Sequence, residues 1–168
     1  MENEKIDALV KAAVLAGLDG CDFLATFDYE ELAREYNGIG PEWLPRTWRE
    51  KASDCLALFA PAALIHDMRY AASDGTSYGF NYANMEFREN CLKLANERYP
   101  WWSWRRYRAR AVAMLLFDFV ASPGGWKAWQ DAYEKRETTS GKQLFGDGGQ
   151  PPADSVAARG CARRKGSC

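Results

Sequence analysis

The chain has a single histidine, His66, and this scarcity excludes several classes of enzyme. Zinc proteases with an HExxH helix and metal-dependent His-Asp phosphohydrolases need two or more histidines. The sequence also lacks a phosphate-binding GxxxxGKS/T loop and a glycine-rich dinucleotide fingerprint after a strand. Any acid–base chemistry that uses an imidazole near neutral pH must therefore pass through His66.

Cysteines are scattered, and none forms a CxxC pair. With one histidine, the chain cannot assemble a Cys/His zinc set. We expect the cysteines of the folded region to be buried or half-buried thiols of a reduced protein rather than a disulfide frame. These are Cys21, Cys55 and Cys91, while Cys161 and Cys168 lie near the C-terminus.

The sequence has no long apolar run and almost no net charge. No stretch approaches the roughly 20 apolar residues of a membrane-spanning helix. The segment Met1-Glu2-Asn3-Glu4-Lys5 lacks the basic and apolar regions of a secretory signal. We therefore expect no signal peptide, no transmembrane segment, and a cytoplasmic or virion-associated location. The net charge of -1 gives no general reason to expect a nucleic-acid partner.

Alternating strand patterns and hairpin turns are also missing, whereas apolar residues recur at helical spacing. Hydrophobic residues make up 47% of the chain and aromatic residues 14%, which is typical of a compact globule. The sequence predicts an all-α fold, with a small helical domain over residues 1–136. After Arg136 the composition shifts to Gly, Ser, Thr, Pro and charge, which predicts a disordered, flexible C-terminal tail over residues 137–168.

Capping and helix-breaking residues set the expected helix bounds. Asp28 is a suitable N-cap, with acidic residues in the following turn. Pro61 suits the first turn of a helix, while residues 37–45 and 76–82 are expected to be loops. We expect helices over residues 5–17, 28–36, 47–58, 60–73, 82–98 and 103–121, and a last short helix through Tyr133.

His66 is followed at once by Asp67, and the pair lies on a predicted helix. On a helix His66 shares a face with Tyr70, four residues on, while Asp67 points about 100° away. The ring can therefore face a substrate while the carboxylate reaches a cation held by a neighbouring loop. Gly38 and Gly40 suit such a loop, because glycine permits the positive φ values that aim successive carbonyls at one point. Calcium takes oxygen ligands of this kind.

Three segments together resemble the core of phospholipase A2. They are Tyr36-Asn37-Gly38-Ile39-Gly40, His66-Asp67-x-x-Tyr70 and Ala83-Asn84-x-x-Phe87, within residues 36–98. The resemblance is closest to the cysteine-poor versions in parvovirus capsid proteins and in small bacterial or prophage proteins. It implies calcium-dependent hydrolysis of phospholipid esters, in a fold where two long antiparallel helices, here 60–73 and 82–98, flank a calcium site.

The resemblance also implies roles for individual residues. His66 would draw a proton from water, Asn84 would orient the ring, and Tyr70 would hold the network behind it. The implied calcium ligands are Asp67 and the carbonyls of Tyr36, Gly38 and Gly40.

The chain departs from the family at Asn84, where family members usually carry an aspartate. An amide oxygen can hold an imidazole, but it supplies no negative charge to favour the imidazolium. Loss of the carboxylate from a Ser-His-Asp triad lowers the rate by about four orders of magnitude. We therefore expect a slow hydrolase, a hydrolase that recruits another carboxylate such as Asp74, or an inactive pseudoenzyme.

Each of these residues also has a simpler interpretation. His66 could be a core histidine bonded to a backbone carbonyl, and Asp67 a solvent-facing helix residue. The two glycines could form a plain turn, and Asn84 could cap a helix or lie on the surface. The rival to the enzyme is then a non-catalytic phage- or prophage-derived helical protein that binds a protein partner or a membrane surface.

Aromatic and arginine residues are dense over residues 101–110, which read Trp-Trp-Ser-Trp-Arg-Arg-Tyr-Arg-Ala-Arg. The indoles could pack into the core, lie among lipid headgroups with guanidiniums on phosphates, or stack on nucleic-acid bases. Core packing is the simplest of the three interpretations, and nucleic acid is the least expected partner. The candidates for contact with a membrane or a protein partner are Trp101, Trp102, Trp104, Arg105 and Arg106.

Overall fold

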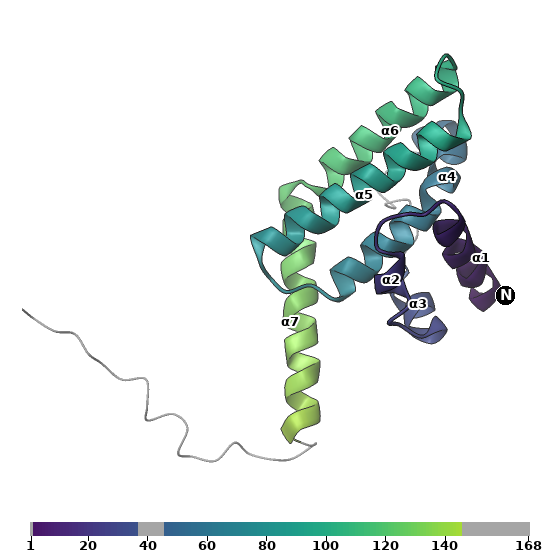
Figure 1. The fold of residues 1–168 in the computed structure, drawn as a ribbon. Coiled ribbons are helices and arrows are strands. Elements are labelled where there is room, and N and C mark those ends of the chain that lie inside the picture. The colour runs from purple at the N-terminus through teal and green to yellow at the C-terminus, as the bar shows by residue number, and fades with distance from the viewer. Residues whose placement is uncertain (1, 37–45, 146–168) are drawn as a thin grey trace, which may run out of the picture. The chain divides into compact units, whose positions relative to one another are not determined.

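The computed structural model describes residues 2–36 and 46–145, with side chains over residues 4–36 and 56–139. Every regular element of these residues is a helix, so the predicted all-α class is confirmed (Figure 1). Contacts divide the chain after Arg136, and the sites discussed below lie in the unit Met1–Arg136. The helices are α1 (Glu2–Leu15), α2 (Cys21–Leu24), α3 (Tyr29–Glu35), α4 (Arg46–Ala71), α5 (Ser77–Arg98), α6 (Trp104–Val120) and α7 (Pro123–Phe145).

Helix α3 begins where its capping residues predict. The backbone N–H of Glu31 donates to the carboxylate of Asp28 at 2.8 Å, and the Glu31 carboxylate accepts from the Asp28 N–H at 3.3 Å. This reciprocal pair satisfies two N–H groups that the helix itself leaves without partners. The N-cap prediction for Asp28 is confirmed.

Helix α4 is continuous through Pro61, so the prediction of two helices, 47–58 and 60–73, is wrong. A proline inside a helix removes one backbone hydrogen bond and costs about 3 kcal/mol. Phe59 and Ala62, on either side of it, are both 0% exposed. Burying a phenylalanine side chain alone contributes roughly 2–3 kcal/mol, so packing offsets the local cost of the proline.

Helix α5 starts at Ser77, earlier than the predicted residue 82. Thr76 caps it, because its hydroxyl accepts from the N–H of Gly79 at 3.0 Å. Phe80, expected in a loop, is 7% exposed and packs edge-on against Trp126 of α7, with ring centroids 5.2 Å apart. Capping and aromatic packing thus place the segment 77–81 in the helix.

Helix α7 runs from Pro123 to Phe145, past Tyr133 and into the segment predicted as a flexible tail. Pro123 opens the helix, where its missing N–H is not needed. Lys127 and Asp131 then form an i,i+4 ion pair at 2.6 Å. Residues 137–145, expected to belong to the flexible tail, are helical, and residues 146–168 lie outside the described part.

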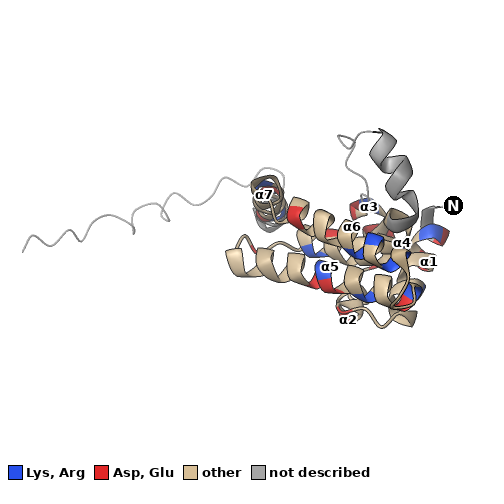
Figure 2. Cartoon of the chain, turned by 90° about the horizontal axis from the view of Figure 1, so that it is seen from above, with Lys and Arg blue, Asp and Glu red and all other residues tan. Residues whose placement is uncertain are grey.

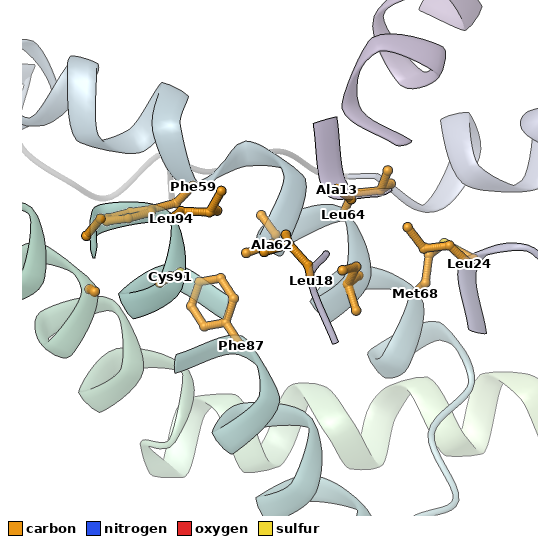
Figure 3. Close-up of a cluster of buried hydrophobic side chains, with 14 of the residues drawn as sticks. Ala13, Leu18, Leu24, Phe59, Ala62, Leu64, Met68, Phe87, Cys91 and Leu94 are labelled. Atoms are coloured by element: carbon orange, nitrogen blue, oxygen red, sulfur yellow. The ribbon is translucent and has the colours of Figure 1, made fainter. Parts of the chain in front are cut away.

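The core centres on α4, which packs against α5, and α5 packs in turn against α6 (Figures 1 and 3). Phe59, Leu64, Ile65 and Met68 of α4 are each at most 1% exposed. A smaller cluster lies beside this core and is formed by Phe80, Ala83, Trp129 and the partly buried Tyr70.

Two cysteines in the described residues are free thiols, as expected. Cys91 is buried in the core, and burial raises the pKa of its thiol far above the ordinary value. Cys21 is half-buried, and the pKa of its thiol is also raised, mainly by burial. The side chain of Cys55, together with Cys161 and Cys168, lies outside the described residues.

Acidic and basic residues are interspersed along the described helices (Figure 2). No described helix contains an apolar stretch long enough to cross a bilayer.

Candidate functional site

Three polar side chains of α4 and α5 meet around the amide of Asn84. The ring nitrogen Nε2 of His66 lies 3.0 Å from Asn84 Oδ1, and the Tyr70 hydroxyl donates to the same oxygen at 3.2 Å. His66 is 7% exposed and Asn84 is 1% exposed. The structure thus brings together the three residues that the sequence suggested for acid–base chemistry, and we call them the polar cluster.

The chemistry of the amide fixes the proton on the imidazole. Asn84 Oδ1 can only accept hydrogen bonds, so Nε2 of His66 must carry the proton when these two atoms are bonded. A neutral ring has one protonated nitrogen, which leaves the lone pair on Nδ1. His66 is therefore arranged to accept a proton at Nδ1.

Burial keeps the ring neutral. It lowers the pKa of His66 to about 4, against the opposing effect of the Asn84 hydrogen bond, which favours the charged form. The Phe87 ring, with its centroid 4.7 Å from the imidazole, contributes to this apolar surrounding. Burial also raises the pKa of Tyr70 to about 12, so its hydroxyl remains a donor at neutral pH.

Asn84 lies in the interior of α5, so its interpretation as a helix cap or surface residue is wrong. The bond to its side chain likewise replaces the backbone carbonyl expected for a simple core histidine. Within the described part of the chain, Asn84 Nδ2 has no hydrogen-bond partner although it is buried. An unsatisfied buried donor costs about 1–3 kcal/mol, so stability alone does not account for this asparagine.

Asp67 lies beside the imidazole but is not bonded to it. Its Oδ1 is 4.0 Å from His66 Nδ1, too far for a hydrogen bond, and the neutral ring makes no ion pair. The Asp67 side chain is 19% exposed. Burial and the charge of Asp67 together raise the pKa of Tyr36, so Tyr36 is close enough to feel this carboxylate.

Part of the predicted calcium site lies beyond the described residues. Tyr36 ends α3 and Asp67 is on α4, but Gly38 and Gly40 fall in the undescribed segment 37–45. Among the described residues, no group of three or more His, Cys, Asp or Glu side chains could hold a metal ion. Calcium also accepts backbone carbonyls as ligands, and these are not among the side chains just considered.

Asp74 holds Thr76, the residue that caps α5. Its carboxylate accepts from the backbone N–H and the hydroxyl of Thr76, each at 2.9 Å. This arrangement leaves Asn84 as the partner of His66, rather than Asp74.

A cavity of about 240 Å³ lies near the α4–α5 connection. Arg69 lines it and forms a two-bond ion pair with the buried Glu86, at 2.9 Å for each bond. The sequence analysis missed this pair, because Glu89 and Asn90 follow on the same side of the helix and the pattern does not mark Glu86 as buried. The cavity is lined by Phe23, Arg69, Ala72, Asp74, Tyr78, Gly79, Tyr82 and Trp129.

The aromatic residues that precede and begin α6 face the solvent. Trp101, Trp102 and Trp104 are 71%, 69% and 76% exposed, so the interpretation that they pack into the core is wrong. Arg105 is also exposed, while Arg106 donates to Asn96 Oδ1 at 2.9 Å.

Comparison of the chain with protein-family models, with curated proteins and with solved structures finds no match.

Proposed function

We propose that the protein hydrolyses phospholipid esters with calcium, in a site that resembles phospholipase A2, with His66 as the base. The observation that carries the proposal is the polar cluster, in which Asn84 Oδ1 directs the His66 lone pair to Nδ1. Asp67 follows His66 on the same helix, and it supplies the carboxylate near the ring that a cation site requires.

In the proposed reaction, Nδ1 of His66 takes a proton from water as the water oxygen attacks the ester carbonyl. Asn84 holds the ring through Nε2, and Tyr70 holds the amide oxygen of Asn84 in place. The proton then passes from Nδ1 to the departing alkoxide, which restores the neutral ring.

The donors near the ring fit calcium, which prefers carboxylate and carbonyl oxygens. Asp67 and the carbonyls of Tyr36, Gly38 and Gly40 would hold the ion. Calcium would polarise the ester carbonyl and stabilise the oxyanion. The effect of Asp67 on the pKa of Tyr36 supports a position of the Tyr36 side chain near this carboxylate. The contact of α4 with α5 supports the further proposal that they are the family's long antiparallel pair.

Asn84 makes the proposed enzyme slow. A base with a pKa of about 4 is neutral at pH 7, but it has little affinity for the proton it must accept. An aspartate at this position would stabilise the imidazolium by charge. We expect Asn84→Asp to raise the rate at least tenfold.

The test is fatty-acid release from phospholipid vesicles, with calcium and with a chelator. We expect slow release that chelation, His66→Ala or Asp67→Asn abolishes. Asp131→Asn is the matched control, because it removes an exposed carboxylate of α7 and should leave release unchanged. Release that survives His66→Ala, or no release by either the wild type or Asn84→Asp, would refute the proposal.

The alternative is a non-catalytic, phage- or prophage-derived helical protein that binds a protein partner or a membrane surface. Exposure of Trp101, Trp102 and Trp104 favours this function, because such side chains usually meet a partner. A purely binding protein would release no fatty acid, and its partner affinity would be indifferent to calcium and to His66→Ala.

A further inference from the structure

The outward side of α6 is mainly apolar, and Arg108 and Asp118 also lie on it. Trp104, Tyr107 and Leu115 are 76%, 58% and 58% exposed, and Ala111 between them is also exposed. Their spacing of three or four residues places them on one face. Met114 and Phe119, 40% and 41% exposed, widen this stripe. We call these side chains the α6 outer face, and its members are Trp104, Tyr107, Ala111, Met114, Leu115 and Phe119.

The opposite side of α6 is apolar too. Ala109 and Ala113 are 0% exposed and belong to the core cluster, on the helix that packs against α5. From Ala111 to Phe117 the helix carries no charged residue, and a helical segment that is apolar on all sides is ordinarily enclosed by protein or by lipid. The outer face is therefore an exposed apolar surface of the kind that protein or lipid usually covers.

Positive charge borders the outer face. Residues 99–117 contain four arginines and no aspartate or glutamate. Arg105, Arg108 and Arg110 are exposed, and neither Arg105 nor Arg110 forms an ion pair within the described residues. Asp118 is the first acid along the helix. A partner for this surface must supply both apolar contact and negative charge.

We infer that the α6 outer face, together with Trp101 and Trp102, docks the protein on an anionic phospholipid surface. Indole and phenol rings favour the headgroup region, while guanidiniums bind lipid phosphates. A second copy of the chain would bring the same arginine-rich, acid-free segment and would offer few carboxylates to pair with it. With about 25 Å of length, α6 would lie in the plane of the interface rather than span it.

This inference deepens the proposed function by naming the surface that would hold the enzyme on its substrate, and it rests on that function only for the identity of the lipid. Binding is therefore measured without turnover, in chelator and with His66→Ala. Vesicles of phosphatidylcholine alone are compared with vesicles that also contain phosphatidylglycerol, by flotation and by tryptophan fluorescence. We expect binding to the anionic vesicles, weakened by salt and accompanied by a blue shift of the indole emission.

Variants separate the contribution of apolar contact from that of positive charge. Leu115→Gln should lower vesicle affinity about tenfold, whereas Leu15→Gln, at a residue of α1 that is 88% exposed, should leave it unchanged. Arg105→Gln and Arg110→Gln should each lower the affinity about fivefold for anionic vesicles. Circular dichroism checks that all four variants are folded.

Three outcomes would overturn the inference. One is equal binding to neutral and anionic vesicles, and another is a loss of binding with Leu15→Gln that equals the loss with Leu115→Gln. The third is a dimer in sedimentation, absent in Leu115→Gln, with no vesicle binding by the wild type. Vesicle binding without fatty-acid release would refute the hydrolysis alone and leave the docking surface established.

Discussion

The polar cluster and the α6 outer face depart from ordinary burial in opposite directions. In the cluster, His66 and Asn84 are polar side chains enclosed by protein. On α6, Trp104 and Leu115 are large apolar side chains left in water. Buried polar groups and exposed apolar patches are the informative exceptions in a folded protein, because burial elsewhere follows polarity.

The two regions differ in how they are tied to stability. A buried hydrogen bond that loses one partner destabilises the fold, since the remaining group cannot reach water. Replacing an exposed side chain changes the free energy of unfolding little, because the side chain is solvated in both the folded and the unfolded chain. Changes in the cluster should therefore alter both stability and chemistry, whereas changes on the α6 outer face should alter binding alone.

The largest effect should come from Gly125→Ala. A Cβ at this position would collide with the carbonyl oxygen of Val120, the atom that also accepts from the Tyr70 hydroxyl. The backbone cannot yield as a flexible side chain can, so we expect a loss of roughly 3 kcal/mol or more in the free energy of unfolding.

Gly124→Ala is the matched control for this change. A Cβ there would meet only Ser122 Oγ, at 3.5 Å, and alanine favours the helix. Chemical denaturation of both variants measures the difference. Equal stability of the two would show that Gly125 does not support the cluster.

The next effect is a dependence of stability on pH through His66. Its pKa is about 4 in the fold and near 6.5 in the unfolded chain, so the unfolded chain binds the proton first as the pH falls. The free energy of unfolding should fall between pH 6.5 and about 4, by about 3 kcal/mol. Below pH 4 this contribution is constant.

His66→Gln removes the titrating ring and isolates its contribution from those of the carboxylates. The stability difference between wild type and variant, measured by urea unfolding, should shift by the same amount between pH 7 and pH 4. A difference that stays constant over this range would contradict the buried neutral imidazole.

A smaller loss should follow Asn84→Ala. This change leaves the Nε2–H of His66 without its acceptor, and we expect a destabilisation of about 2 kcal/mol. Met85→Ala, at the adjacent residue that is 42% exposed, should change stability by about 0.5 kcal/mol or less. Thermal and urea unfolding of the pair measure this, and similar losses in both variants would count against the cluster.

The smallest effect should be that of Trp104→Gln, on the other side of the comparison. Its side chain is 76% exposed, so the free energy of unfolding should change by about 0.5 kcal/mol or less. A loss several times larger in chemical denaturation would mean that the indole belongs to the core.

Local signals predicted much of the fold. Helical spacing and the Asp28 cap indicated the existence of most helices, because these signals act within a few residues. The break predicted at Pro61 and the predicted start of α5 were wrong. Both helix bounds depend on the burial of Phe59 and Phe80 against residues distant in sequence. Local preference is weak enough for such packing to override it.

In the candidate site, too, the features set by local geometry could be predicted and those set by packing could not. The shared face of His66 and Tyr70 follows from helical geometry, whereas the approach of Asn84 requires the packing of a second helix. Burial of the imidazole, and hence its low pKa, could not be read from its neighbours in sequence. The exposure of Trp104 was equally hidden, because composition does not reveal which side of a helix is covered.

The hydroxyl of Tyr70 connects the polar cluster to the end of α6. It reaches Asn84 at 3.2 Å and the carbonyl of Val120, the last residue of α6, at 3.3 Å. One proton is shared between these two acceptors, so a movement of the end of α6 changes how firmly the amide is held. A displacement of the end of α6 is thereby passed through the Tyr70 phenol to the amide that holds the imidazole.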